Sequence, residues 1–502
     1  MADAPSFRLY NSLTRQVEAV EPLEDEHLRF YACGPTVYTY AHIGNFRSFL
    51  TADLIARTAQ ALGWETTFVS NITDVGHLTE DDLTDPEGED KMAAALEREG
   101  QRFANIFDLA RYYTDALLTD WRALNLTEPD VRPRATEHVS HQIQAVEKLM
   151  RSGHAYETDQ GVYFSVEQFS DYGKLSGNTT ADQLQATDRE TVEDSDKRDP
   201  RDFALWKKDP DHLMQWHSPW GWGFPGWHIE CSVMSMEYLG APFDMHTGGE
   251  DLAFPHHECE IAQNESLAGE STVNYWIHTR FLQVEGEKMS KSSGNFYTVR
   301  DLIEPAEDGG HGLDPLALRY TLMAGQYRKP FNFTKKTLSD SARIIQRYQA
   351  AADAVDTALA SDTEGPDHAA ERLPDLYDAT LAAMCDDLNT PKALAKALEG
   401  VKFINGLGDD LNTATARTAQ DWLEDTNDLL GIVWPADSDA ASSDSETDPL
   451  AKQVEALLDE RAAAREAGNY ERADAIRDQL DAMGIEVKDS ADGTTWQRKA
   501  VL

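Results

Sequence analysis

A strand, a glycine-marked turn, a helix and a second strand follow one another between residues 27 and 72, and this order constrains the fold most. HLRFYAC at 27–33 has the composition of a buried strand, and the turn GPTVYTYAHIG follows it. Mostly apolar residues then recur every four positions from Phe46 until Gly63 can end the helix, and TTFVSNI at 66–72 resembles a further strand. This order is typical of a parallel α/β unit, so we expect an α/β fold with a Rossmann-type sheet.

The rest of the chain changes character several times. The α/β pattern breaks into mixed helix and polar loop and resumes near Trp216, while the tail combines a helix striped by Ala473, Ile476 and Leu480 with a hairpin turning at Asp492-Gly493. We predict a catalytic domain at 1–285 with an insertion at about 76–215, a connecting domain at 286–340, a helical bundle at 341–435, an acidic linker at 436–449 and a small C-terminal domain at 450–502.

The charge of the chain is strongly one-sided. There are 89 acidic and 45 basic residues among 502, which gives a formal net charge of −44. Aromatic and aliphatic residues remain plentiful, so the composition is not that of a disordered chain. Either the protein is adapted to a salt-rich cytoplasm, where screening suppresses self-repulsion, or it is an ordinary acidic enzyme. With neither a signal peptide nor a long apolar run in the sequence, we expect a cytoplasmic protein without a membrane partner.

Two short segments have the composition of phosphate-binding loops. In AHIGN, residues 41–45, His42 and Gly44 lie where the first strand gives way to the helix, a place that favours anions. In EGEKMSKSSGN, residues 285–295, Lys288 and Lys291 stand between glycines and serines and could close on a triphosphate. The alternatives are a structural histidine in a turn and a basic surface loop.

The segment FPHHECE at 254–260 suggests a metal site. His256 and Glu260 are four residues apart and share one helix face, although such a pair is often only a solvated face. Two thiols strengthen the metal interpretation, because Cys33 ends the first strand and Cys231 lies in GWHIECS. Two thiolates, one imidazole and one carboxylate form a plausible zinc shell.

Helical spacing separates the other residues of this segment from the expected ligands. His257 and Glu258 should point elsewhere, and Cys259 should be turned about 100° from Glu260. We therefore expect Cys259 to be a buried thiol outside the metal shell. Cys385 has no evident partner in the sequence and is expected in the core or at the surface.

Several motifs together resemble one family. HIGN after the first strand and KMSKS later resemble the ATP site of class I aminoacyl-tRNA synthetases. Six further segments resemble cysteinyl-tRNA synthetases more narrowly: YACGPTVYTYAHIGN, PRATEH, DFALWK, GWHIECS, FPHHE and the tail ERADAIRDQLDAMGI. The resemblance covers nearly the whole chain except the acidic linker. It implies ATP-dependent ligation of L-cysteine to cysteine tRNA through a cysteinyl-adenylate, by a monomer whose helical region and tail recognise the tRNA, with Trp496 and Arg498 as candidate anticodon contacts.

The resemblance also implies roles for individual residues. One zinc ion per chain would be bound by Cys33, Cys231, His256 and Glu260, and Mg²⁺ would accompany ATP. The implied ATP-binding residues are Gly34, His42, Gly44, Asn45, Lys288 and Lys291, with His42, Asn45, Lys288 and Lys291 as catalytic groups and Thr73, Trp227 and His246 lining the cysteine pocket. Cys259 departs from the family pattern, which has asparagine there.

The implied zinc has a chemical purpose and raises one difficulty. Zinc binds a substrate thiolate, which is a soft ligand, but does not bind a serine hydroxyl in the same way. The selection of cysteine over serine would therefore be chemical rather than steric. Four protein ligands normally close a zinc site, so we expect Glu260, the hard donor, to loosen when substrate binds. Two other functions stay open at this point: ligation of cysteine to an amino sugar, and a zinc-stabilised binding protein without activity.

Overall fold

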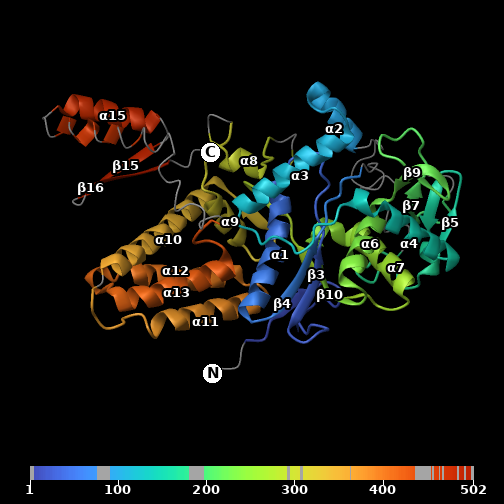
Figure 1. Cartoon of the computed structure of the whole chain (residues 1–502), viewed down its shortest axis with the longest axis horizontal. Helices are drawn as coiled ribbons and strands as arrows, with labels where there is room; N and C mark the ends of the chain where they lie inside the picture. The colour runs from blue at the N-terminus through green and yellow to red at the C-terminus, as the bar shows by residue number, and fades with distance from the viewer. Residues whose placement is uncertain are drawn as a thin grey trace.

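Four parallel strands form the central sheet of the catalytic region (Figure 1). The computed structural model describes residues 5–75, 91–179, 197–290, 294–305, 309–361 and 363–435, with parts of 454–498. The sheet order is β11-β10-β3-β4, and every neighbouring pair is parallel. Its strands are β3 (His27–Ala32), β4 (Glu65–Ser70), β10 (Phe243–Gly249) and β11 (Val273–Thr279).

The strand–helix–strand unit predicted from the sequence is present. Helix α1 (Ile43–Ala61) joins β3 to the parallel β4, and Gly63 follows the helix with a φ of 84°, a conformation that glycine adopts without strain. Buried residues occur all around α1, because the sheet lies on one side of it and other helices on the rest. The expected α/β fold class with a parallel sheet is therefore confirmed.

A second, antiparallel sheet lies within the insertion and extends beyond its predicted end. Its five strands follow the order β5-β6-β7-β9-β8. The α/β pattern predicted to resume near Trp216 begins with two antiparallel strands, since β8 and β9 pair with each other and β9 pairs with β7. The parallel sheet itself resumes at β10. The elements of this region are α2 (Lys91–Glu99), η2 (Gly100–Arg102), α3 (Ile106–Ala123), η3 (Ala135–His138), α4 (Val139–Arg151), β5 (Ala155–Glu157), β6 (Gly161–Phe164), η4 (Val166–Gln168), β7 (Phe203–Lys207), β8 (Trp216–Ser218) and β9 (Gly221–Pro225).

Further elements complete the site and the connecting region. Helix α6 (Trp227–Leu239) leads from the insertion to β10, and FPHHECE spans η6 and the first turn of α7. Strand β12 pairs with β13 and, in parallel, with β14. The bounds are β1 (Arg8–Asn11), β2 (Gln16–Ala19), η5 (Glu250–Leu252), η6 (Ala253–His257), α7 (Glu258–Ala268), β12 (Leu282–Val284), β13 (Glu287–Lys288), α8 (Val299–Ile303), α9 (Pro315–Met323) and β14 (Phe331–Phe333).

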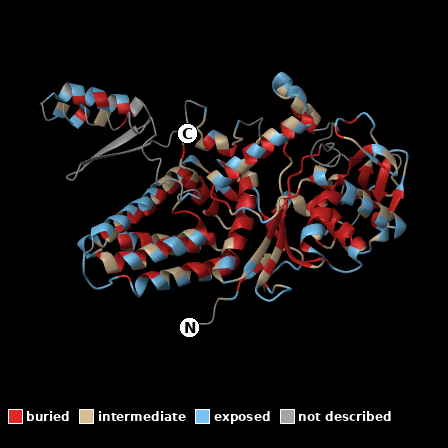
Figure 2. Ribbon diagram, in the orientation of Figure 1, coloured by how far each residue is buried: buried red, intermediate tan, exposed pale blue. Residues whose placement is uncertain are grey.

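A bundle of long helices follows the catalytic region. Figure 2 shows buried residues in the sheet, in α1 and along the bundle helices, and one hydrophobic cluster includes Phe46 of α1, Tyr348 of α10 and Leu423 of α13. The bundle and the catalytic region therefore share a core. Its helices are α10 (Lys335–Ser361), α11 (Arg372–Cys385), α12 (Thr390–Asn405) and α13 (Thr413–Leu430), with η8 (Gly408–Asp410) between the last two.

The C-terminal segment contains the predicted helix and hairpin. Helix α15 (Tyr470–Ala482) buries the predicted stripe, and β15 (Ile485–Ser490) pairs antiparallel with β16 (Gly493–Arg498). Trp496 and Arg498 lie on β16, opposite Val487 and Ile485. The acidic linker at 436–449 lies outside the described residues. Among the helices that the structure describes, none is both long and apolar enough to cross a bilayer.

Candidate active site

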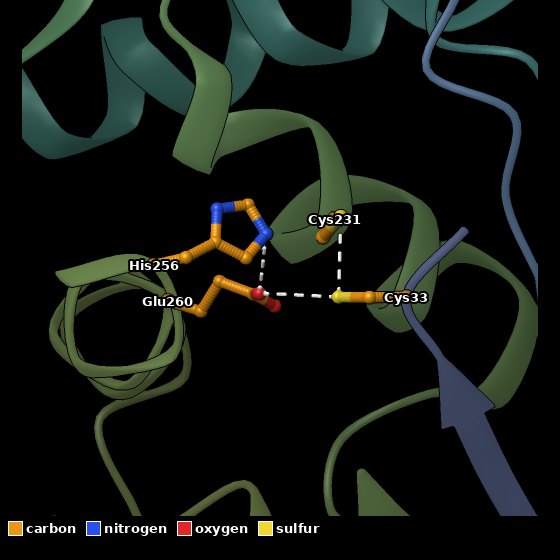
Figure 3. A group of neighbouring side chains, drawn as sticks. All are labelled: Cys33, Cys231, His256 and Glu260. Carbon is orange, nitrogen blue, oxygen red and sulfur yellow. Dashed lines mark hydrogen bonds and ion pairs between the residues drawn. The ribbon is translucent and has the colours of Figure 1, made fainter. Parts of the chain in front are cut away.

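Four donor side chains meet beside the carboxyl end of β3 (Figure 3). Cys33 directly follows that strand, Cys231 lies on α6, and His256 and Glu260 come from η6 and α7. The Cys33 Sγ atom is 3.9 Å from Cys231 Sγ and 3.9 Å from Glu260 Oε1. The His256 Nε2 atom is 3.1 Å from Glu260 Oε1. The sequence predicted these residues as one set, and the structure brings them together.

This donor set fits zinc in both spacing and chemistry. One ligand atom from each residue lies within 4.8 Å of all the others, and all four residues are buried. Tetrahedral zinc with ordinary bond lengths spaces two sulfur ligands about 3.8 Å apart and a nitrogen and an oxygen ligand about 3.3 Å apart. The observed separations of 3.9 Å and 3.1 Å are close to these values. Thiolate and imidazole donors are also the ligands that zinc prefers.

Burial and neighbouring charges set the protonation of these donors. Burial opposes the charged form of Glu260, but the imidazoles of His246 and His256 lower the pKa of its carboxyl to about 2. A hydrogen bond with Cys33 lowers the pKa of the Cys231 thiol to about 7, whereas burial raises the pKa of Cys33 well above its usual value. Near neutral pH Glu260 is thus ionised and Cys231 partly so. Burial opposes the charged form of His256, but Glu260 and Cys231 raise its pKa to about 10, so this ring carries a balancing positive charge.

His257 also reaches the cluster, which corrects the prediction that it points elsewhere. Its Nε2 atom lies 3.4 Å from Cys33 Sγ, and Cys33, His246, His257 and Glu260 form a second set of converging donors. Regular helical spacing does not hold here, because residues 253–257 form a wide π-helical turn in which Phe254 has extended backbone angles. Glu258 does point away, and it accepts hydrogen bonds from the backbone of Gly173 and Ser176.

Histidines behind the cluster orient its rings. The Nδ1 atoms of His228 and His256 are 2.8 Å apart, which leaves the Nε2 atom of His256 facing Glu260. His257 Nδ1 is likewise 2.8 Å from His278 Nε2. A ligating histidine is commonly held through its other ring nitrogen in this way. The sequence analysis missed His228 and His278; His228 stands beside Trp227 in GWHIECS, but nothing local marks His278.

The predicted ATP-binding histidine begins helix α1. The backbone N–H of Asn45 donates to His42 Nδ1 at 3.1 Å, and the Asn45 side-chain oxygen accepts from the backbone N–H of His42 at 3.1 Å. Because Nδ1 accepts a hydrogen bond, a neutral His42 ring carries its proton on Nε2, the tautomer that can donate to a phosphate oxygen. Asn45, the third residue of α1, thus holds the ring of the N-cap His42 in position through a capping box.

The KMSKS segment runs beside this helix start. Residue His42 pairs with Thr298, and its ring contacts Phe296 with the centroids 5.3 Å apart. Lys288 is exposed on β13, and the Asn295 side chain donates to its carbonyl oxygen. Lys291, the second predicted lysine, lies outside the described residues. The two predicted ATP motifs are therefore adjacent, as far as the structure describes them.

Two glycines at this end of the sheet lie very close to neighbouring residues. A Cβ on Gly34 would lie 1.7 Å from the backbone oxygen of Asn71, and the Gly34 N–H donates to the Asn71 side chain at 2.8 Å. A Cβ on Gly44 would lie 2.9 Å from the His42 ring and 3.4 Å from Met289 of the KMSKS segment. Backbone therefore excludes a larger residue at position 34, whereas a larger residue at position 44 would force the His42 ring to move.

The three residues predicted to line the cysteine pocket lie around the donor cluster. The Trp227 ring is 4.4 Å from the His256 ring, centroid to centroid, and His246 Nε2 is 2.9 Å from Glu260 Oε2. Thr73 is buried after β4, where its backbone N–H donates to Pro35 in the turn that follows Cys33. This placement is compatible with the predicted roles.

The two other cysteines lie outside the donor sets. Cys259 is buried on α7 with its sulfur 3.6 Å from the Tyr172 hydroxyl, so the expectation of a buried thiol away from the cluster agrees with its position. Cys385 is buried at the end of α11, within the core that the bundle shares with the catalytic region. Neither forms a disulfide.

Known proteins similar to this chain identify its family. Residues 19–343 match the family described as tRNA synthetases class I (C) catalytic domain, 381–434 match the DALR domain, and 447–496 match the cysteinyl-tRNA ligase anticodon binding domain. A cysteine–tRNA ligase of Salinibacter ruber is 68% identical over 511 residues, with 99% of each chain covered. The chain belongs to the cysteine–tRNA ligase family. A cysteine–tRNA ligase of Chlorobaculum tepidum is 39% identical to this ligase over 503 residues, covering 98% of this chain and 99% of the relative.

Solved structures with this fold are also class I synthetases. Methionyl-tRNA synthetase of Mycobacterium tuberculosis bound by methionyl-adenylate has a TM-score of 0.58 at 14% identity and covers 84% of this ligase and 94% of its own chain. A leucyl enzyme of Agrobacterium radiobacter, solved as the complex LeuRS-tRNA-LeuAMS, has a TM-score of 0.59 at 11% identity and covers 85% and 86%. At these identities the likeness concerns the fold alone. The full-length relatives are enzymes, which argues against a binding protein without activity.

Proposed function

We propose that this ligase charges tRNA with L-cysteine in two steps, and that zinc bound by Cys33, Cys231, His256 and Glu260 selects the substrate sulfur. The convergence of these four buried donors beside the end of β3 carries the proposal. The same strand end leads into the turn that bears His42, so a substrate whose sulfur lies at the donors would direct its carboxylate toward the nucleotide.

Selection of cysteine over serine needs more than a shaped pocket. A pocket that only fits the shape of a side chain discriminates about 10–200-fold between two substrates that differ by one small group. Bound zinc would supply a soft Lewis acid that accepts a thiolate in preference to a hydroxyl. We expect Glu260 to leave the metal when the substrate sulfur binds, because its second carboxylate oxygen already lies 2.9 Å from His246 Nε2. The carboxylate would keep a hydrogen-bonding partner after moving.

The first step joins cysteine to the nucleotide. An oxygen of the cysteine carboxylate attacks the α-phosphorus of ATP, the bond to the β-phosphate oxygen breaks, and pyrophosphate leaves with Mg²⁺. The Nε2 proton of His42 and the ammonium groups of Lys288 and Lys291 would stabilise the negative charge that develops. In the second step a hydroxyl of the terminal tRNA ribose attacks the carbonyl carbon of the adenylate and releases AMP. Positioning and electrostatics suffice, so no side chain acts as a covalent nucleophile.

Metal removal tests this proposal directly. The expected result is that chelated enzyme loses cysteine-dependent ATP–pyrophosphate exchange, and that zinc restores both the exchange and the preference for cysteine over serine. Cys231→Ala should lower the zinc content, whereas Cys259→Ala is a matched control that alters a buried thiol outside the donor sets and should keep it. Metal-free enzyme that still prefers cysteine as sharply would contradict the proposal. A parallel assay with an amino sugar as acceptor, expected to show no product, separates the alternative ligase.

A further inference from the structure

Four polar residues fasten the end of the helical bundle to the helix that carries His42. Asp53 and Arg57 lie on α1, Asn125 follows α3, and Arg319 lies on α9. We call these four residues the α1–α13 junction, because Arg57, Asn125 and Arg319 contact the end of α13 or the residues after it, and Asp53 pairs with both arginines. Figure 1 shows α1 between the sheet and the bundle, with α13 running outward from it.

Arg319 is the central cation of the junction and is fully buried. Its Nη2 atom is 2.5 Å from Asp53 Oδ2, and neither side chain is exposed to solvent. Its other donors reach the carbonyl oxygens of Leu430 at 2.8 Å, Leu124 at 3.0 Å and Asn125 at 2.9 Å. One guanidinium therefore joins α1, the end of α3 and the end of α13. Removing one partner of such a buried pair is strongly destabilising, so the arrangement is held tightly.

Arg57 and Asn125 add further hydrogen bonds around this buried ion pair. The Arg57 guanidinium donates to the carbonyl oxygens of Asp428 at 2.8 Å and Asn125 at 2.9 Å, and its Nε is 2.8 Å from Asp53 Oδ1. The Asn125 side-chain amide donates to the carbonyl oxygens of Gly431 and Trp434, each at 3.0 Å. Side chains from α1 and from the segment after α3 therefore both bind the end of α13 and the residues that follow it.

Arg57 and Arg319 add hydrogen-bond donors at the C-terminal end of helix α13, where Gly431 in the left-handed conformation forms the cap. The last carbonyls of a helix lack partners within it, and cations stabilise the negative end of its dipole. The last turn of α13 contains no basic residue of its own. Arg57 and Arg319 supply the missing donors and positive charge from the catalytic region. The catalytic region therefore stabilises the end of a bundle helix.

This arrangement links the direction of the bundle to the nucleotide site. Helix α1 has 19 residues, with His42 as its N-cap and the junction in its second half, so it is a rod about 28 Å long. Helix α13 has 18 residues, and a tilt of about 10° at its fastened end would displace the far end by about 5 Å. A displacement of about 1 Å is already enough to impair a reaction that depends on positioning.

We propose that the α1–α13 junction sets the angle between the bundle and the adenylate site, and that Arg57, Asn125 and Arg319 are positioning residues for tRNA charging. Adenylate formation needs only ATP and cysteine, which contact the catalytic region, whereas charging also requires the tRNA to reach from the bundle to His42. The inference rests on the two-step function proposed above. Loosening the junction should therefore impair charging while leaving pyrophosphate exchange intact.

Asn125→Gly is the cleanest test. Asn125 has a φ of 54°, which glycine adopts without strain, so the substitution removes the two amide hydrogen bonds while preserving the backbone. We expect kcat/KM for tRNA to fall about tenfold, within the range of coupling energies of linked sites, with exchange changed less than about twofold. Arg57→Met should act in the same direction. Asn405→Gly is the matched control, because it removes one amide hydrogen bond to Arg347 inside the bundle and leaves the junction intact.

The possible results separate positioning from stability and from the proposed function itself. A purely structural role would lower exchange and charging together, in proportion to the folded fraction measured by urea unfolding, and would overturn the inference. Charging that falls less than about threefold in both junction variants, or equally in the Asn405→Gly control, would also overturn it. Failure of the proposed function would instead appear as absent cysteine-dependent exchange in the unaltered enzyme.

Discussion

Asp120 is a buried carboxyl group whose ionisation should make the stability of the enzyme depend on pH. Its side chain is 1% exposed on α3, and the Arg300 Nε atom lies 3.1 Å from its Oδ1. Burial is the largest influence on Asp120 and raises its pKa to about 7, although Arg300 opposes the shift; Glu304 and Asp301 reinforce it. Arg300 lies on α8, which begins next to Thr298, the residue that pairs with His42.

The magnitude and sign follow from the difference between folded and unfolded states. The pKa of Asp120 rises from 3.8 to about 7 on folding, a difference of about 3 units or about 4 kcal/mol. Between these values the folded enzyme binds a proton that the unfolded chain has lost. The free energy of unfolding should therefore fall by about 1.4 kcal/mol per pH unit as the pH rises toward 7, and this contribution should level off above it.

Urea unfolding of the wild type and of Asp120→Asn between pH 5 and 8.5 measures this contribution. The wild type should lose about 2–3 kcal/mol relative to the variant from pH 5 to 7, and little more above pH 7.5. Asp115→Asn, which alters an exposed carboxylate on the same helix, is the control and should show no such slope. A difference that stays constant or grows with pH would show that Arg300 keeps Asp120 ionised, and would refute the reasoning.

Two further predictions concern the strand end and the surface charge. Gly34→Ala should destabilise the enzyme by at least about 3 kcal/mol and abolish exchange, because the new Cβ would lie 1.7 Å from a backbone oxygen; a melting temperature equal to that of the wild type would contradict this. Aminoacylation should increase with KCl above about 0.2 M, because salt shortens the Debye length and screens repulsion between tRNA and a chain of net charge −44; an optimum below that concentration would contradict adaptation to salt.

Local patterns predicted the central unit well. The strand, turn and helix around His42 follow from apolar periodicity and from Gly63, and the structure has them within a few residues of the expected bounds. The four expected metal donors also meet, because the carboxyl end of a parallel strand faces the ligand crevice and places Cys33 there. The role of these donors as a zinc site stays a prediction that metal analysis can test.

Other features could not be predicted because nonlocal contacts determine them. Trp216 begins an apolar, glycine-rich segment that would suit either sheet, and only its pairing with Gly223 places it in the antiparallel one. His257 was expected to point away from the cluster, and a single extended residue, Phe254, changes the helical register enough to bring it in. Neither effect leaves a periodic signal in the sequence.

The sequence by itself determined the chemistry of this enzyme: which thiols, imidazoles and lysines are available, and where glycine lets strand and loop pass closely. Tertiary structure alone decided which residues from distant segments support that chemistry. His278 on β11 holds the His257 ring of the donor cluster, and Arg319 on α9 donates to the last carbonyl oxygen of α13. Such contacts join positions far apart in the chain, and burial in a low-dielectric interior makes them strong, so they become evident only when the core is assembled.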